Sequence, residues 1–317
     1  MVDGKGIIVI LVYFAVSILI FLSGFVPAGG VVDISFSPVV LSLVLLVPLF
    51  VWYRLVGSKF GGKNAKEKIG RKQIIFDVLG LFVLSMVVRI PLVLIMGMSY
   101  EKTAVVYLVV LFAMLVRGLS MSSLGFKGKD FVRSILIGIV YYAFYAVALF
   151  GTFFASIYFL SGHLVVVSYD PVPALIVFPF MTLCVGVSEE GLFRGFMQTR
   201  LGRVFSERRA LLIQAVLFGL WHFVWHVSPL DFFGMFIHVL YTFVFGLIFG
   251  QFFRVSRSLV PLILAHGLVD TVGYGAILNP ELDSASPLVA GAQALSFLVG
   301  MLVLALSSKV LARHARR

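Results

Sequence analysis

Charged residues and cysteine are scarce in this chain. Only 12% of its 317 residues are charged and 61% are hydrophobic, whereas about a quarter of the residues of a typical soluble domain are charged. Water therefore cannot be the main solvent, and we predict a polytopic membrane protein. The single cysteine, Cys184, excludes an intrachain disulfide framework and any thiolate-cluster metal site. We expect Cys184 to be a small packing residue in an apolar helix.

Three protease signatures are also missing. The sequence has no HExxH, which argues against that class of zinc metalloprotease. It has no GxSxG, since Gly186-Val187-Ser188 leads into Glu189 and not into a glycine, and this argues against a serine nucleophile of that kind. No GxGD pairing of aspartates occurs. If the chain is hydrolytic, a glutamate that activates water is the chemistry it can supply.

Long apolar runs are what the sequence has in abundance. A span of about 20 apolar residues crosses the hydrocarbon core of a membrane. We therefore predict an all-α transmembrane helical bundle of about ten spans, the first of them a retained helix and not a cleaved signal. Their approximate limits are 6–26, 38–57, 74–98, 103–117, 131–160, 173–197, 210–228, 231–253, 259–279 and 288–308.

The basic residues predict the topology. The formal charge of +11 does not indicate nucleic acid, because these residues flank apolar segments in alternate connections. The positive-inside rule then places both termini in the cytoplasm of a cell-membrane protein with an even number of spans. The other connections carry mostly acids, with Lys102 as their only basic residue. The basic set is Arg54, Lys59, Lys63, Lys66, Lys68, Arg71, Lys72, Arg117, Lys127, Lys129, Arg133, Arg200, Arg203, Arg208, Arg209, Arg254, Arg257, Lys309, Arg313, Arg316 and Arg317. The acidic set is Asp33, Glu101, Asp170, Asp231, Glu281 and Asp283.

A pair of adjacent glutamates lies inside one apolar run. Ionisable residues at membrane depth are costly and are usually functional. Glu190 and Arg194 are four residues apart with the acid first, which is the favourable order for a helical ion pair. Adjacent helical residues point about 100° apart, so Glu189 is free to face a cavity and act as a general base. Gly191 and Gly195 allow a neighbouring helix to approach closely. The alternative is a purely structural network of buried ion pairs.

Histidines follow on the next apolar segments. His222 lies one turn after Phe218, and it either holds a water or metal beside Glu189 or bonds to a backbone carbonyl of a neighbouring helix. The spacing of His222 and His226 also permits a metal pair, although Trp225 suggests that His226 is interfacial. His238 is a weaker candidate.

His266 and Asp270 form a further pair with i,i+4 spacing. On one helical face, Asp270 would orient His266 or both would stabilise an oxyanion, and a purely structural bond is the alternative. Arg89 also falls within an apolar run, beside Ile90-Pro91. It has no obvious partner in the sequence, and we assign it no role.

Taken together, these motifs resemble those of a known family. Glu189-Glu190 with Arg194, Phe218 with His222, and His266 with Asp270 follow the pattern EExxxR, FxxxH and HxxxN or HxxxD of the CAAX protease and bacteriocin-processing (CPBP, Abi) family. These intramembrane endopeptidases are related to CAAX prenyl protease 2. The resemblance covers about residues 173–280, which predicts a protease core there. We expect residues 1–172 to form membrane helices of unknown role, and residues 281–317 a last helix with a basic tail.

The resemblance implies a role for each motif residue. Glu189 and His222 would activate water, and His266 and Asp270 would form an oxyanion hole. Glu190 and Arg194 would support them. Prenyl-protein members carry Asn where this chain has Asp270. An aspartate donates a hydrogen bond only when protonated, so Asp270 either is protonated or orients His266.

Metal dependence stays open at this point. The family is often labelled metalloprotease, and zinc is the one cofactor to consider, with Glu189, His222 and His266 as its ligands if it binds. The spacing of the residues assigns no metal, because hydrolysis by a glutamate and a histidine without zinc fits equally well.

We therefore expect an intramembrane endopeptidase with a membrane-associated substrate, which the resemblance suggests is prenylated. The polar clusters lie inward from helix ends with basic flanks, and we expect access from the cytoplasmic leaflet. One alternative is a noncatalytic scaffold or immunity factor that keeps the motif residues. A proton-coupled transporter is the other, but all three clusters fall in the carboxy-terminal half, without the symmetry that transport favours.

Overall fold

The computed structural model describes residues 4–25, 38–57, 59, 70–127, 130–162, 167–274, 276–278 and 286–316. Within this part of the chain nearly every element is a helix, which confirms the predicted all-α bundle. Several predicted features lie outside the described residues: the Gly- and Pro-containing segments 27–30 and 279–280, which the sequence predicts to be connections between spans, and Asp33, Lys63, Lys66, Lys68, Lys129, Glu281, Asp283 and Arg317.

The first half of the chain forms five helical segments. They are α1 (Gly4–Ser23), α2 (Pro38–Trp52) with the π-helical η1 (Tyr53–Gly57), α4 (Arg71–Met96), α5 (Lys102–Leu111) with the π-helical η2 (Phe112–Val116), and α6 (Phe131–Ser161). A 3-10 turn, η3 (Met121–Leu124), lies between η2 and α6.

The second half continues the bundle and contains the only strands among the described residues. One helical rod consists of α7 (Pro171–Phe180), η4 (Met181–Gly186), α8 (Val187–Glu189), η5 (Glu190–Gln198) and α9 (Thr199–Leu201), with η4 and η5 in π-helical geometry. It is followed by α10 (Glu207–Leu220), the 3-10 turn η6 (Phe223–His226), α11 (Phe232–Ser256), α12 (Val260–Thr271) and α13 (Pro287–Arg316). Strands β1 (Val167–Tyr169) and β2 (Ala276–Leu278) pair antiparallel, with Ser168 opposite Ile277.

Seven of the described helical segments are long and apolar enough to cross a membrane. They are 4–23, 38–57, 71–96, 131–161, 171–201, 232–256 and 287–316. The other three segments predicted as spans are shorter helices, namely 102–116, 207–220 and 260–271. Each of the ten predicted segments therefore contains a helix, but three of these helices are too short to cross the hydrocarbon core alone, and the segment predicted at 259–279 also contains strand β2.

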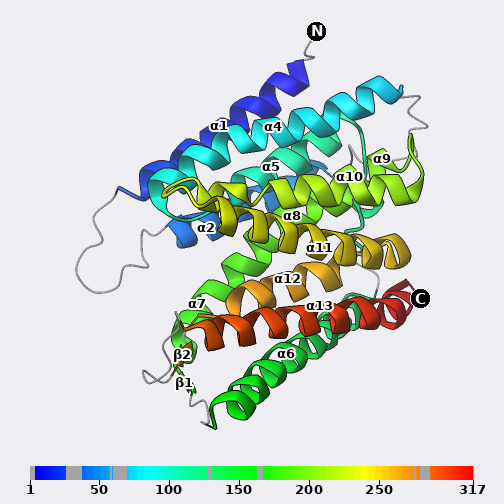
Figure 1. The fold of residues 1–317 in the computed structure, drawn as a ribbon. Coiled ribbons are helices and arrows are strands. Elements are labelled where there is room, and N and C mark those ends of the chain that lie inside the picture. The colour runs from blue at the N-terminus through cyan, green and yellow to red at the C-terminus, as the bar shows by residue number, and fades with distance from the viewer. Residues whose placement is uncertain are drawn as a thin grey trace.

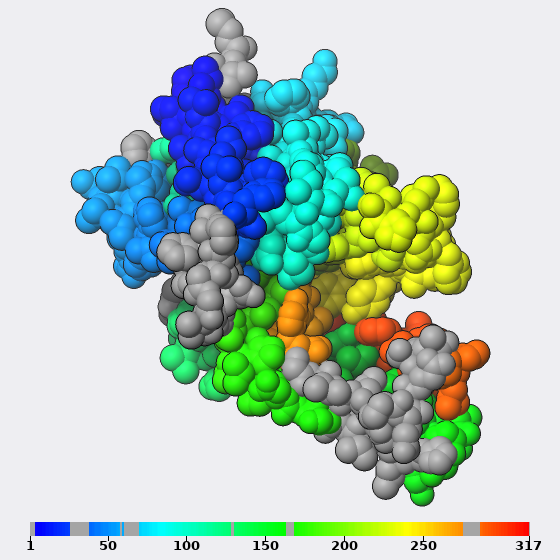
Figure 2. Space-filling view, turned by 90° about the vertical axis from the view of Figure 1, so that its left-hand side faces the viewer, coloured from blue at the N-terminus to red at the C-terminus, as the bar shows by residue number. Residues whose placement is uncertain are grey.

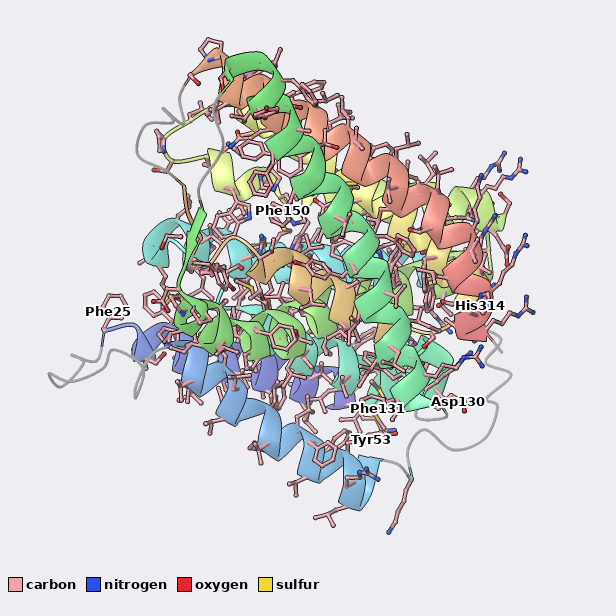
Figure 3. The ribbon with its side chains drawn as sticks, turned by 90° about the horizontal axis from the view of Figure 1, so that it is seen from below. Phe25, Tyr53, Asp130, Phe131, Phe150 and His314 are labelled. Atoms are coloured by element: carbon pink, nitrogen blue, oxygen red, sulfur yellow. The ribbon has the colours of Figure 1, made fainter. Side chains whose placement is uncertain are left out.

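The helices run side by side across the view of Figure 1, with α1 and α4 along its upper edge and α6 and α13 along its lower edge. Helices α10, α11 and α12 lie between them, where α10 packs on α11, and α12 packs on both α6 and η4. Asp130, Phe131 and His314 lie at one end of the bundle and Phe25 at the other (Figure 3). Among the described residues, the basic side chains near Asp130 and His314 thus lie at the end of the bundle opposite Phe25.

The outer surface is apolar, as a membrane-embedded protein requires. Phe159, Val147 and Phe76 are among many large apolar side chains exposed on the long helices. The interior instead contains a belt of charged residues surrounded by aromatic rings, including Trp221, Phe193 and Phe218. Cys184 is buried and is a free thiol, as predicted for the single cysteine of the chain.

Candidate active site

The two glutamates lie where an α-helical turn passes into π-helical turns. Glu189 ends α8 and Glu190 begins η5, and π-helical turns inside helices frequently mark functional sites. The rod begins at Asp170, whose Oδ1 accepts a hydrogen bond from the Val172 N–H at 3.0 Å. Glu189 is only 3% exposed and Glu190 is fully buried. The backbone therefore positions both carboxylates deep in the bundle.

Two glycines of this region permit close approach of other segments. A Cβ on Gly186 would lie 2.7 Å from the carbonyl oxygen of Ile263 on α12. A Cβ on Gly195 would lie 2.9 Å from the carbonyl oxygen of Leu124 on η3, as expected for this residue. Gly191 meets only the Phe126 side chain at ordinary contact distance, so the close approach expected there does not occur.

Glu190 holds two groups in place. Its Oε1 accepts a hydrogen bond from Arg194 Nη1 at 3.1 Å, and this is the ion pair that the spacing predicts. The same oxygen lies 2.7 Å from Nδ1 of His266, so Nδ1 donates to the carboxylate and Nε2 points away from it. The Arg194 guanidinium also stacks over the Phe218 ring at 4.1 Å. Glu190 thereby orients His266, a contact that the sequence does not reveal.

His222 follows the end of α10. Its Nδ1 lies 2.8 Å from the carbonyl oxygen of Phe218, and because a carbonyl only accepts, Nδ1 is the donor. Nε2 then faces Glu189, 3.9 Å from Oε2. His222 therefore lies beside Glu189, as one of the two predicted roles requires, and its bond is to a carbonyl at the end of α10 and not to one of a neighbouring helix.

His266 and Asp270 are the other two predicted catalytic residues, and both lie beside Glu189 and His222. His266 Nε2 lies 3.6 Å from Glu189 Oε2 and 3.5 Å from Asp270 Oδ2. His266 is buried, whereas the Asp270 side chain is 33% exposed. Glu189, His222, His266 and Asp270 all line one cavity of about 270 Å³. Glu190 and Arg194 lie behind this wall and do not line it.

The remaining histidines form a neighbouring pair. His226 Nε2 and His238 Nδ1 are 3.0 Å apart, and the His238 ring also lies 5.3 Å from that of His222. Since α10 ends at Leu220 and residues 223–226 form a 3-10 turn, His222 and His226 do not share a face of one α-helix. The structure gives no support to a His222–His226 metal pair.

Three charged residues lie at or beside the site, Arg89 of α4, Glu101 just before α5 and Lys102 of α5, and sequence reasoning assigned none of them a role in it. The Lys102 ammonium contacts Glu189 Oε1, although Lys102 was expected in a connection. Arg89 forms an ion pair with Glu101 and donates from Nε to the Trp221 carbonyl at 3.1 Å. Arg89 therefore has partners after all. The one available signal was that Arg89, Glu101 and Lys102 are charged residues near one another in an apolar region.

The two carboxylate oxygens of Glu189 have different surroundings. Oε1 accepts from Lys102 and, at 3.0 Å, from the indole N–H of Trp221. Oε2 is buried and has no hydrogen-bond partner in the part of the chain that the structure describes. Both contacts to Oε1 fix the plane of the carboxylate, so Oε2 faces the cavity between the two imidazoles.

A resident metal does not fit these residues. No group of three His, Cys, Asp or Glu side chains among the described residues is arranged to hold a metal ion. In addition, the Lys102 ammonium contacts the carboxylate that would be the central ligand, and the Arg89 guanidinium lines the same cavity. Two fixed positive charges oppose the binding of a divalent cation there.

Residues 171–272 match the Rce1-like family, described as type II CAAX prenyl endopeptidase. This segment contains all three motifs and confirms the resemblance to the CAAX protease family. The match indicates an intramembrane protease, and with the apolar helices it makes the chain a membrane protein. It covers about a third of the 317 residues and includes neither α4 nor α5. No curated protein and no solved structure matches the chain.

Proposed function

We propose that the protein is an intramembrane endopeptidase that hydrolyses a peptide bond of a membrane-associated polypeptide without a metal. The observation that carries this proposal is Oε2 of Glu189, which is buried, has no hydrogen-bond partner among the described residues, and faces Nε2 of His222 and of His266 at 3.9 and 3.6 Å. Buried polar groups normally have a hydrogen-bond partner. An acceptor without one, between the imidazoles of His222 and His266, is a suitable place for the water that attacks the peptide bond.

Glu189 is the proposed general base. Hydrogen bonds to water are about 2.8 Å long, so one water can contact both Glu189 Oε2 and His222 Nε2 across 3.9 Å. Glu189 takes a proton as the water oxygen bonds to the peptide carbonyl carbon. It then returns the proton to the leaving amine, which completes hydrolysis with no other reactant.

His266 and Asp270 are placed to stabilise the oxyanion. With Nδ1 donating to Glu190, a protonated His266 ring presents its Nε2–H to the cavity, where the negative oxygen of the tetrahedral intermediate would lie. One such donor contributes roughly 10²- to 10³-fold to the rate of acyl transfer. Asp270 lies 3.5 Å from the same nitrogen and either orients it or, when protonated, adds a second donor.

The test is peptide cleavage by the purified full-length protein in detergent. Prenylated and unprenylated C-terminal CaaX peptides and a hydrophobic membrane-segment peptide would be offered, and the products identified by mass spectrometry. We expect cleavage of at least one peptide, unchanged by a metal chelator and lost in Glu189→Gln. Cleavage of none would favour a noncatalytic membrane partner. Loss of activity on chelation, restored by zinc, would contradict the metal-free mechanism.

A further inference from the structure

A second pocket, of about 170 Å³, lies at the end of the bundle where Figure 3 labels Asp130 and His314. It lies between the start of α6, the connection from α11 to α12, and the last turn of α13. None of its lining residues lines the active-site cavity. The lining residues considered below are Lys127, Asp130, Arg133, Ser258 and Arg316.

Helix α12 connects this pocket with the active site. It begins two residues after Ser258, which lines the pocket, and it carries His266 and Asp270, which line the active-site cavity. Figure 2 looks at the opposite end of the bundle, where the surface of α12 is orange and that of the start of α11 is yellow. The pocket and the active-site cavity are therefore two separate sites.

The pocket has an excess of positive charge. Lys127, Arg133 and Arg316 line it, Asp130 is the one acid among its described lining residues, and none of the three cations forms an ion pair within the described part of the chain. Partial burial, and then the charges of Arg257 and Arg316, lower the pKa of Lys127 below its ordinary value. Like charges held near one another repel, so a bound anion would stabilise this arrangement.

Two helices begin at the pocket without the residues that usually complement a helix start. Neither α6 nor α12 has an acidic residue in its first turn, and Asp130, at the N-cap position of α6, makes no capping hydrogen bond. The N-terminus of a helix has free N–H groups and a partial positive charge, which together favour an anion. Arg133 lies in the first turn of α6, where a cation is unfavourable unless an anion is bound.

Ser258 adds a buried hydroxyl group to the pocket. The residue is only 1% exposed, and its Oγ has no hydrogen-bond partner among the residues that the structure describes. Its backbone N–H donates to Ser256 Oγ at 3.2 Å. Because buried hydroxyl groups normally have a partner, the Ser258 O–H is available as a donor to an oxygen atom of a ligand.

We propose that this pocket binds a phosphate group, which belongs either to the headgroup of an anionic phospholipid or to free phosphate. Phosphate oxygens accept hydrogen bonds from arginine, lysine, hydroxyl and helix N-terminal N–H groups, and basic pockets between membrane helices bind anionic headgroups. Phe131 and Val132, at the start of α6, are 52% and 70% exposed. A lipid whose chains lie against them would have its headgroup beside the pocket.

Simpler explanations account for only part of this arrangement. The helix dipole favours basic residues in the last turn of α13, and the topology favours basic residues in the connections at one end of a bundle. Neither explains Arg133 in the first turn of a helix, or a buried hydroxyl without a partner at Ser258.

The test is the unfolding temperature of the delipidated full-length protein in detergent. The probes are phosphatidylglycerol, with phosphatidylcholine as its control, and inorganic phosphate, with sodium chloride of equal ionic strength as its control. A ligand that binds only the folded state raises this temperature with its concentration. We expect such a rise with phosphatidylglycerol or inorganic phosphate, and none with either control. A rise with the lipid alone identifies a headgroup site, and a rise with inorganic phosphate identifies a site for free phosphate. No rise with either probe would overturn the proposal.

Three variants show whether the active probe binds in this pocket. Arg316→Gln removes a lining charge, and Arg313→Gln is its matched control, because Arg313 lies in the same last turn of α13 but does not line the pocket. Ser258→Ala removes a donor without changing the charge. We expect the apparent Kd of the probe to rise about tenfold for Arg316→Gln and about three- to tenfold for Ser258→Ala, and to stay unchanged for Arg313→Gln. Equal weakening by the two arginine variants, or unchanged binding by Ser258→Ala, would overturn the proposal.

Arg133→Gln should have opposite effects on the free and the bound protein. It removes a cation from the start of α6, so we expect the unfolding temperature without a probe to stay the same or rise. The rise that the probe causes should become smaller, because one ligand contact is lost. A full rise with the probe in Arg133→Gln would contradict the role of Arg133 in the site.

Discussion

Lys102 and Glu189, 87 residues apart in the chain, form an ion pair in the interior of the bundle. Lys102 comes from the first turn of α5 and Glu189 from the last residue of α8. Both side chains are at most 3% exposed. The pair links the segment that matches the protease family to helices outside that match, so the proposed general base depends on the amino-terminal half for its position.

The first prediction concerns Lys102 as a positioning residue. Lys102→Met leaves the Glu189 carboxylate with one donor, Trp221, on Oε1, and breaking a buried ion pair costs about 3 to 5 kcal/mol. We expect kcat to fall at least about tenfold with KM little changed, as for an interaction that acts mainly in the transition state. Exposed Lys309→Met is the control.

A double variant tests whether Lys102 acts through Glu189 or only stabilises the fold. Lys102→Met with Glu189→Gln removes both charges, so we expect its thermal unfolding in detergent to occur closer to wild type than that of Lys102→Met alone. Two destabilisations that simply add would show that Lys102 and Glu189 are not coupled. If the kcat of Lys102→Met equals that of wild type, Lys102 is not a positioning residue for Glu189.

The Arg89–Glu101 ion pair should matter chiefly for stability. Arg89→Met leaves Glu101 buried, with Lys102 at 3.8 Å as its one remaining ion-pair partner among the described residues, and removes the bond to the Trp221 carbonyl. We expect a loss of about 3 to 5 kcal/mol, measured by thermal or denaturant unfolding in detergent. Arg71→Met, at an exposed position, should change stability by less than about 0.5 kcal/mol. Equal effects of the two substitutions would contradict the buried network.

Asp270 can be tested by two substitutions. Asp270→Asn keeps a polar group of the same shape beside His266 Nε2, 3.5 Å away in the wild type, and an amide can donate to an oxyanion. We expect cleavage within about threefold of wild type for Asn and a loss of about 10²-fold for Ala, as for other oxyanion donors. If Asn is as inactive as Ala, the carboxylate charge is needed to hold His266.

The approach of α12 to the rod of residues 171–201 depends on Gly186. An added Cβ would lie 2.7 Å from the Ile263 carbonyl oxygen, so Gly186→Ala must move α12 and with it His266. Overpacking of this kind typically costs about 1 to 3 kcal/mol, and we expect reduced activity as well. Gly291→Ala on α13, with open space around the new methyl group, should be neutral or stabilising by up to about 1 kcal/mol. Similar behaviour of the two variants would refute the close contact.

Sequence reasoning predicted the fold class correctly and selected motif residues that the structure brings together, because apolar run length and i,i+4 spacing are local properties. The Glu190–Arg194 pair is one example. The contact of Glu190 with His266 spans 76 residues, and no local pattern encodes it. Lys102 was expected in a connection because it follows a break in hydrophobicity, yet tertiary packing buries it. The lengths of α10 and α12 were overestimated because apolar residues continue past the point where each helix ends.

The most direct test of the central claim is the rate of peptide cleavage in detergent by Glu189→Gln and by Glu207→Gln. Both substitutions remove one carboxylate and keep the side-chain shape, but Glu207 is exposed and pairs with Arg257 at the far end of the bundle. We predict a rate for Glu189→Gln at least about 10²-fold below wild type, as expected for loss of a general base, and an unchanged rate for Glu207→Gln. Cleavage by Glu189→Gln at the wild-type rate would show that Glu189 is not the base.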